Sequence, residues 1–154
     1  MTATNHALTG ATIGLLVGIP VIAIPASVLS HFICDALPHF GARDKEGSLK
    51  KKWFKNYLIV EASICFLIVL VIAIVQPTHW QLAALCAFLA ASPDFLWIRK
   101  YRAVKKNKKW RPNLFDKFAS NIQWFQRPIG AWVEAAWFFA AISILIPILS
   151  LAKK

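Results

Sequence analysis

The length of its apolar stretches most constrains how this chain can fold. The first stretch runs almost without interruption over residues 7–37, and three more follow at 57–76, 80–97 and 129–151. A helix of ~20 apolar residues is long enough to cross a bilayer. With 58% hydrophobic residues, 16% charged residues and a mean hydropathy of +0.54, the chain is too apolar for an ordinary water-soluble domain. We therefore predict an all-α, polytopic membrane helix bundle, with residues 1–154 forming a single integral-membrane domain.

The first apolar stretch is too long for one straight span, and a Gly-Ile-Pro sequence interrupts it at residues 18–20. Either one span covers residues 8–29, or two short helices, roughly 4–18 and 21–37, form a hairpin that turns at this sequence. The hairpin is favoured because it returns His6 to the membrane face where the second helix ends. The sequence alone leaves both arrangements open.

Charge between the apolar stretches predicts the orientation. The net charge of +11 comes mainly from two basic loops, at 40–56 and 98–111. Loops rich in Lys and Arg stay on the cytoplasmic side of a membrane, so we place both loops there. The count is then about five membrane helices, as two short hairpins and a C-terminal span that exits on the opposite face with Lys153 and Lys154. Residues 113–126 space apolar side chains at helical intervals, which predicts an amphipathic helix at the interface.

The sequence lacks the signals of secretion, redox chemistry and several common enzyme classes. Residues 1–9 contain no Lys or Arg, so the basic region of a signal peptide is missing and we expect the N-terminus to be retained. Cys34, Cys65 and Cys86 are isolated within apolar stretches. We therefore expect them to act as small hydrophobic residues, and we expect no disulfide and no metal thiolate. There is no GxSxG, P-loop or HExxH motif.

Ionisable side chains at the end of the first apolar stretch have a spacing typical of metal ligands. His31, Asp35 and His39 follow one another at i, i+4 and i+8. Successive helical residues are ~100° apart, so His31 and Asp35 share a face and can reach a common point. Pro38 cannot continue the helix, so we expect His39 on the exit turn. Ionisable groups within a membrane are costly and usually functional.

Other helices add ionisable groups to the same predicted cytoplasmic face. His6 and Asp94 complete a predicted ligand set of His6, His31, Asp35, His39 and Asp94, which suits a divalent ion, with Zn²⁺ and Mn²⁺ both fitting. Glu61 and Glu134 lie about one turn inside their helices, where a charge costs ~2.5–3.5 kcal/mol at the helix centre. Because each would enter the same membrane face from a neighbouring helix, Glu61 and Glu134 are the predicted catalytic general bases. The structural alternative is that the His31–Asp35 pair forms only a helix-to-helix hydrogen bond, contributing roughly 1 kcal/mol.

These residues resemble the small bacterial inner-membrane proteins known as membrane-bound metal-dependent hydrolases. The resemblance covers most of the chain through short motifs: His6, the segment 31–39, Asp94 after its proline, and a polar patch at 119–126. In this chain the patch carries amides where a further histidine would strengthen a metal site. The resemblance implies a multi-pass protein of the bacterial inner membrane with a metal-dependent site facing the cytoplasm.

Three classes of function compete. The first is a metal-dependent hydrolase acting on a lipid or lipid-linked phosphoester, with the basic loops holding anionic head groups. The second is a non-enzymatic membrane protein whose polar cluster is structural or conducts an ion. The third is a tether that uses the basic run 98–111. Anionic membrane lipid is the expected partner of that run, at ~1 kcal/mol per Lys or Arg, and no nucleic-acid partner is expected because no binding motif accompanies it. The oligomeric state stays open.

Overall fold

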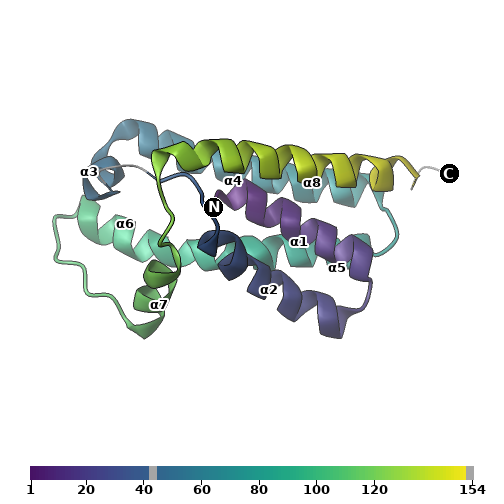
Figure 1. The fold of residues 1–154 in the computed structure, drawn as a ribbon, viewed down its shortest axis with the longest axis horizontal. Coiled ribbons are helices and arrows are strands. Elements are labelled where there is room, and N and C mark those ends of the chain that lie inside the picture. The colour runs from purple at the N-terminus through teal and green to yellow at the C-terminus, as the bar shows by residue number, and fades with distance from the viewer. Residues whose placement is uncertain (42–44, 152–154) are drawn as a thin grey trace.

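The computed structural model describes residues 1–41 and 45–151, and no strand is present among them. The elements are α1 Ala3–Val17, α2 Pro20–Ala36, α3 Lys45–Lys50, α4 Lys52–Val75, α5 Trp80–Ala91, the 3₁₀ turn η1 Ser92–Leu96, α6 Trp97–Lys105, α7 Leu114–Ile122, the 3₁₀ turn η2 Pro128–Gly130, and α8 Ala131–Leu151 (Figure 1). The all-α prediction is confirmed. The predicted exit of Lys153 and Lys154 lies outside the described residues.

Three helical stretches in the described part of the chain are long and apolar enough to cross a membrane, namely Lys52–Val75, Trp80–Lys105 and Pro128–Leu151. Helices α1 and α2 are shorter, with 15 and 17 residues. The expected count of about five membrane helices is therefore not confirmed. The second stretch joins α5, η1 and α6 into one rod of 26 residues, so the basic run expected as a loop from residue 98 begins as helix.

Helices α1 and α2 form the favoured hairpin. Gly18 ends α1 in the left-handed conformation, with φ of 65°, and its N–H donates to the Gly14 carbonyl at 3.3 Å. Glycine adopts this conformation without a steric cost, which explains the residue type at the turn. Pro20 then occupies the first turn of α2, where a missing N–H is tolerated. The single-span arrangement is wrong.

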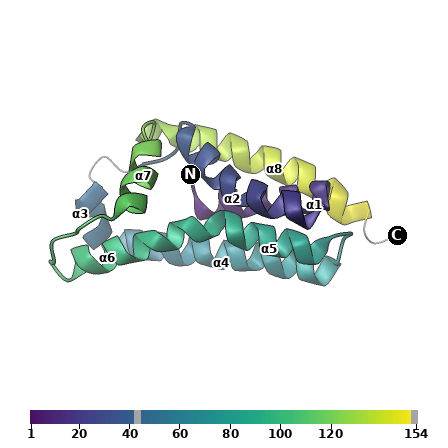
Figure 2. The ribbon, with the colours of Figure 1, turned by 90° about the horizontal axis from the view of Figure 1, so that it is seen from below.

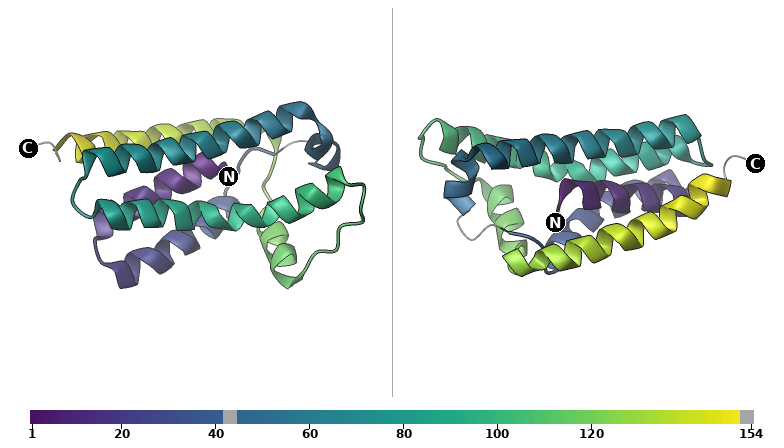
Figure 3. Two further views of the ribbon diagram at one scale, coloured as in Figure 1. Left: turned by 180° about the vertical axis from the view of Figure 1, so that it is seen from behind. Right: turned by 90° about the horizontal axis from the view of Figure 1, so that it is seen from above.

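Helix α1 lies in the middle of the bundle and contacts α2, α4, α5 and α8 (Figure 3). Its closest neighbour is α5, because Gly10 and Gly14 allow the two backbones to approach. A Cβ atom on Gly14 would lie 2.5 Å from the Cα of Ala83. Ala83 and Ala87 on α5 are almost fully buried in this contact. Small residues at such spacing are typical of helix pairs in membranes.

The two ends of the bundle differ. The turn after α1, the turn between α4 and α5 and the C-terminal end of α8 lie at one end, while α3, α6 and α7 gather at the other (Figures 1 and 2). The N-terminus of α1 and the C-terminus of α2 point toward this second end. Helix α2 stops at Ala36, and Leu37 is extended before Pro38, as predicted. His39 then accepts a backbone hydrogen bond from Arg127 at 3.0 Å, which ties the exit turn to the start of the last helix.

Candidate metal centre

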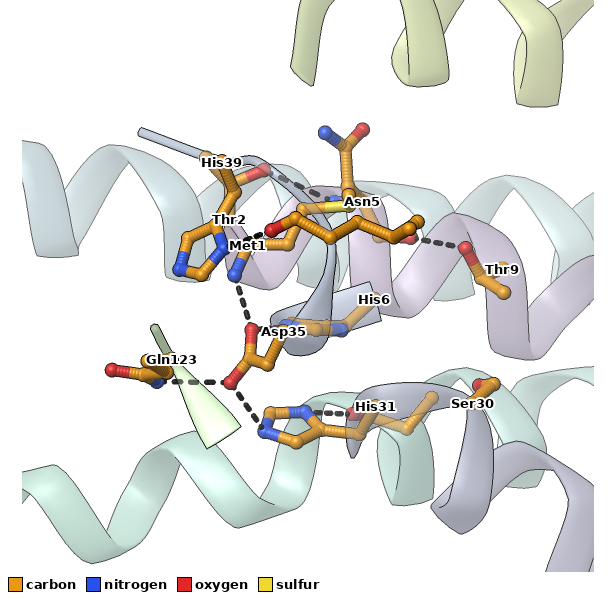
Figure 4. A network of polar contacts seen from close by, with 12 residues as sticks. Met1, Thr2, Asn5, His6, Thr9, Ser30, His31, Asp35, His39 and Gln123 are labelled. Carbon is orange, nitrogen blue, oxygen red and sulfur yellow. Dashed lines mark hydrogen bonds and ion pairs between the residues drawn. The ribbon is translucent and has the colours of Figure 1, made fainter. Parts of the chain in front are cut away.

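Asp35 lies at the middle of a buried polar cluster built from α1 and α2. Its Oδ1 is 3.1 Å from His6 Nε2, and its Oδ2 is 3.4 Å from His31 Nε2 (Figure 4). The carboxylate therefore bridges two histidines from different helices. His31 and Asp35 lie one helical turn apart on α2, as predicted, and the hairpin brings His6 to them from the other helix, α1. Asp35 is 3% exposed.

Two further groups contact the Asp35 carboxylate. The amino group of Met1 contacts Oδ1, and Gln123 Nε2 donates to Oδ2 at 2.9 Å (Figure 4). Gln123 belongs to the amide-rich patch before the last helix. No local pattern assigns it to the cluster, because its partner Asp35 lies 88 residues earlier in the chain. The only signal was its position in that patch.

The histidine ring of His31 is oriented by the backbone of α5. Its Nδ1 lies 2.8 Å from the carbonyl oxygen of Ala90, which can only accept, so the geometry assigns the proton to Nδ1. In the neutral ring this leaves a lone pair on Nε2. A hydrogen bond of this kind is what orients metal-binding histidines in known sites.

His6 contains a ring nitrogen with no partner. The side chain is fully buried, and its ring stacks on that of His31 with centroids 3.9 Å apart. Nε2 reaches Asp35, but Nδ1 has no hydrogen-bond partner in the described structure. A buried polar atom without a partner costs free energy, so this nitrogen is available to a ligand.

Asp94 approaches the same histidines from η1, in the long rod. One ligand atom from each of His6, His31 and Asp94 lies within 4.8 Å of the others. Around Zn²⁺, donors at ~2.0–2.2 Å are separated by roughly 3.4 Å in a tetrahedron, so a modest side-chain adjustment would close this group. The Asp94 carboxylate makes no hydrogen bond or ion pair with other described residues, unlike Asp35. His6, His31 and Asp94 thus form a group that could hold a metal ion.

Asp35, another predicted ligand, is not a member of this group of described residues. His39, the last predicted ligand, is placed differently. Its ring is buried, and Nδ1 lies 2.8 Å from the carbonyl of Leu37 two residues earlier. Among the described residues it is not a member of the close group formed by His6, His31 and Asp94. It instead lines the cavity beside this group.

Glu61 and Glu134, the predicted general bases, contact the N-terminus of α1. Glu134 uses both oxygens, accepting from the backbone N–H of Phe40 at 3.0 Å and of Thr2 at 3.1 Å. Glu61 uses one oxygen, Oε2, for the N–H and hydroxyl of Thr4 at 2.9 and 2.8 Å. The first N–H groups of a helix have no partner within the helix and favour negative charge. Both carboxylates therefore hold α1 in place, which the sequence did not predict.

A cavity of about 240 Å³ adjoins the cluster. Asp94, Glu61, Glu134 and His39 line it beside the cluster. Another part of its lining is aromatic and aliphatic and comes from α3, α4 and α6, namely Leu49, Trp53, Phe54, Tyr57, Leu58, Trp97, Ile98 and Tyr101. The cavity thus places carboxylates beside an apolar wall.

Comparison of the chain with protein-family models, with curated proteins and with solved structures finds no match.

Proposed function

We propose that this protein is a membrane-embedded, metal-dependent hydrolase that acts on a lipid or lipid-linked phosphoester at the cytoplasmic membrane face. The observation that carries the proposal is the meeting of His6, His31 and Asp94 within 4.8 Å, next to a cavity with an apolar wall. The basic residues near this end support the cytoplasmic orientation through the positive-inside rule. The resemblance to membrane-bound metal-dependent hydrolases of the bacterial inner membrane points to the same class.

The donor set fits a divalent ion such as Zn²⁺ or Mn²⁺. His6 and Asp94 would each supply one donor, as would His31 through Nε2. Asp35 would hold the His6 ring in the orientation that frees Nδ1, or would itself be a further ligand. Three protein donors leave a coordination position open for water, as in catalytic sites. When bound, the ion would act as a Lewis acid and lower the pKa of a water ligand toward ~7.

Glu61 is the better-placed general base. Both oxygens of Glu134 are occupied by backbone N–H groups, so its carboxylate is held as a structural acceptor. Glu61 has only Oε2 engaged and is half-buried at the cavity wall, which leaves Oε1 to accept a proton from water. Loss of that proton to solvent would follow through the open side of the cavity.

The lipid nature of the substrate is supported by the surroundings. Helix α7 exposes Leu114 and Phe118, which suits an amphipathic helix at the interface. The neighbouring α6 carries exposed basic side chains such as Arg102 and Lys105. A basic surface beside an apolar one attracts an anionic leaflet. An anionic membrane lipid is therefore the proposed partner of this face.

A structural role for the cluster is the second candidate, and one observation favours it. Without any ion, Asp35 already contacts the Met1 amino group, His6, His31 and Gln123. A carboxylate with this many partners can hold a helix hairpin together with no further function. The two candidates differ in what they require of Asp94, which only the metal site uses.

Metal analysis of detergent-purified protein tests the proposal. We expect close to one divalent ion per chain, and at least a tenfold loss in Asp94→Asn, because that change removes a ligand and no hydrogen bond. Asp116→Asn is the matched control, since Asp116 caps the exposed α7. The metal-loaded protein should also hydrolyse a chromogenic phosphodiester such as bis(p-nitrophenyl) phosphate, and Glu61→Gln should slow it.

Full metal content in the double variant Asp35→Ala/Asp94→Ala would remove the physical basis of the hydrolase. Metal-free wild-type protein that stays folded would support the structural role. Metal-loaded protein without hydrolysis of any phosphoester would leave a metal site but no enzyme.

A further inference from the structure

The cavity beside the cluster has two chemically different ends. Asp94 and Glu61 lie at the end next to α1, where a metal ion would neutralise their charge. Lys100 is the one Lys or Arg side chain among the described residues that line the cavity. It follows Asp94 by six residues on the same rod, which is roughly 9 Å of helical rise. A ligand that reaches from the cluster to Lys100 would thus contact the metal-binding cluster at one end and an ammonium group at the other.

Lys100 differs from the other cations of the basic run. It is half-buried, whereas Arg99, Arg102 and Lys105 are exposed. Its Nζ lies 4.9 Å from the ring centre of Trp97, one turn earlier, and this contact restrains the ammonium group. Both side chains also line a second cavity, of about 290 Å³, between α6 and α7. Lys100 therefore lies in the wall between two cavities instead of on the outer surface.

We propose that a lipid binds in the 240 Å³ cavity and that Lys100, restrained by Trp97, contacts its anionic head group. Lys100 would thus be the residue that selects anionic lipids. The inference rests on the proposed function and narrows its substrate to an anionic lipid. The charged phosphate of the lipid would lie against the ammonium group, with its scissile ester bond toward Asp94. The acyl part would contact the aromatic wall, which includes Phe54 and Tyr57.

The apolar wall favours a lipid over a soluble phosphate. A small anion would satisfy Lys100 but leave the side chains of Trp53, Phe54 and Leu58 uncovered. Contact between an acyl chain and these side chains removes apolar surface from water, which contributes ~25 cal/mol per Å². An ion pair with a half-buried lysine is also screened less by salt than a surface pair. Together these features select a molecule that is both anionic and apolar.

Binding measurements in non-ionic detergent test the assignment. Dihexanoyl phosphatidylglycerol, with one net negative charge, and dihexanoyl phosphatidylcholine, with none, are titrated while tryptophan fluorescence is recorded. We expect wild-type protein to prefer the anionic lipid. We expect Lys100→Gln to lose that preference, with the phosphatidylglycerol affinity falling about tenfold or more and the phosphatidylcholine affinity unchanged. Lys100→Arg should keep most of the preference because it keeps the charge.

Lys105→Gln is the matched control. Lys105 lies on the same helix and its Nζ is 5.8 Å from the ring centre of Tyr101, but it is exposed and lines neither cavity. Its preference should equal that of the wild type. Lys117→Gln tests the second cavity, which Lys117 lines without reaching the first. Inorganic phosphate at millimolar concentration should not compete with the lipid.

The outcomes separate this inference from the proposed function. Equal losses in Lys100→Gln and Lys105→Gln would show a diffuse basic field and overturn the inference. Loss of the lipid preference in Lys117→Gln alone would show that the head group binds in the second cavity. Competition by inorganic phosphate would show that the site binds the phosphate group and not a lipid. Either result overturns the inference. If the protein binds metal and hydrolyses the phosphodiester but Lys100→Gln keeps the lipid preference, the inference is overturned and the proposed function stands. Metal-free protein with a Lys100-dependent preference would overturn the proposed function and keep the head-group site.

Discussion

The two halves of helix α1 meet opposite chemistry. Its N-terminal turns contact carboxylates, with Thr2, Thr4 and His6 bonded to Glu134, Glu61 and Asp35. Its later turns contact the backbone of α5 through Gly10 and Gly14, whose nearest neighbours are backbone atoms of Cys86 and Ala83. One helix therefore provides a polar end and a tightly packed stem.

The packed later turns of α1 position the site, whereas its N-terminal turns carry the polar groups of the site. The stem fixes α1 against α5, and the carbonyl of Ala90 on α5 orients the ring of His31. The packing thus determines how the ring nitrogens face Asp94, although no packed residue belongs to the cluster. Changes in the stem should affect folding, and changes at the polar end should affect metal content while the fold persists.

The largest effect is expected from Gly14→Leu. Even the Cβ atom would lie 2.5 Å from the Cα of Ala83, so α1 and α5 must separate. We expect a loss of at least about 3 kcal/mol, at the upper end of what over-packing costs. Thermal unfolding followed by circular dichroism in detergent measures it.

Leu16→Ala is the control for this change, because Leu16 is on the same helix but 64% exposed. It should unfold at nearly the wild-type temperature. A Gly14→Leu protein as stable as the wild type would show that the stem is not what positions α1.

A smaller effect is expected from Glu134→Gln. The amide keeps one acceptor oxygen but turns an N–H group toward Thr2 or Phe40, so one backbone donor loses its partner. An unsatisfied buried donor costs about 1–3 kcal/mol. We expect lower thermal stability with metal content unchanged, measured on the same preparation. Metal loss without loss of stability would instead place Glu134 in the metal centre.

Much of the fold followed from local sequence signals. The hairpin, its turn at Gly18 and the end of α2 before Pro38 depend on residues with strong backbone preferences, and all three were predicted. The continuation of helix into the basic run was missed, because the run of Lys and Arg from residue 98 indicated a loop. Pro93 occupies the first turn of η1, where proline is tolerated.

The site was only partly accessible from the sequence. The i, i+4 spacing of His31 and Asp35 predicts their contact, and the hairpin predicts the approach of His6. The parts played by Gln123 and Glu134 depend on contacts across 88 and 132 residues, which no local pattern encodes. The same holds for Lys100, whose half-buried position distinguishes it from the other cations of its run only once the chain has folded and α3 is packed against α6.

The smallest effect is expected from Gln123→Ala. The change removes one hydrogen bond, 2.9 Å long, from the Oδ2 atom of Asp35 but leaves its contacts with His6 and the Met1 amino group. We expect a loss of about 1 kcal/mol, or ~2–4 °C in the unfolding temperature. Because Asp35 orients the histidines, the metal affinity should also fall about tenfold. Gln81→Ala, on the exposed face of α5, is the control and should change neither quantity. If Gln123→Ala lowered stability and left metal affinity intact, Asp35 would belong with Glu134 as a structural acceptor, and the functional part of the polar end would reduce to His6, His31 and Asp94.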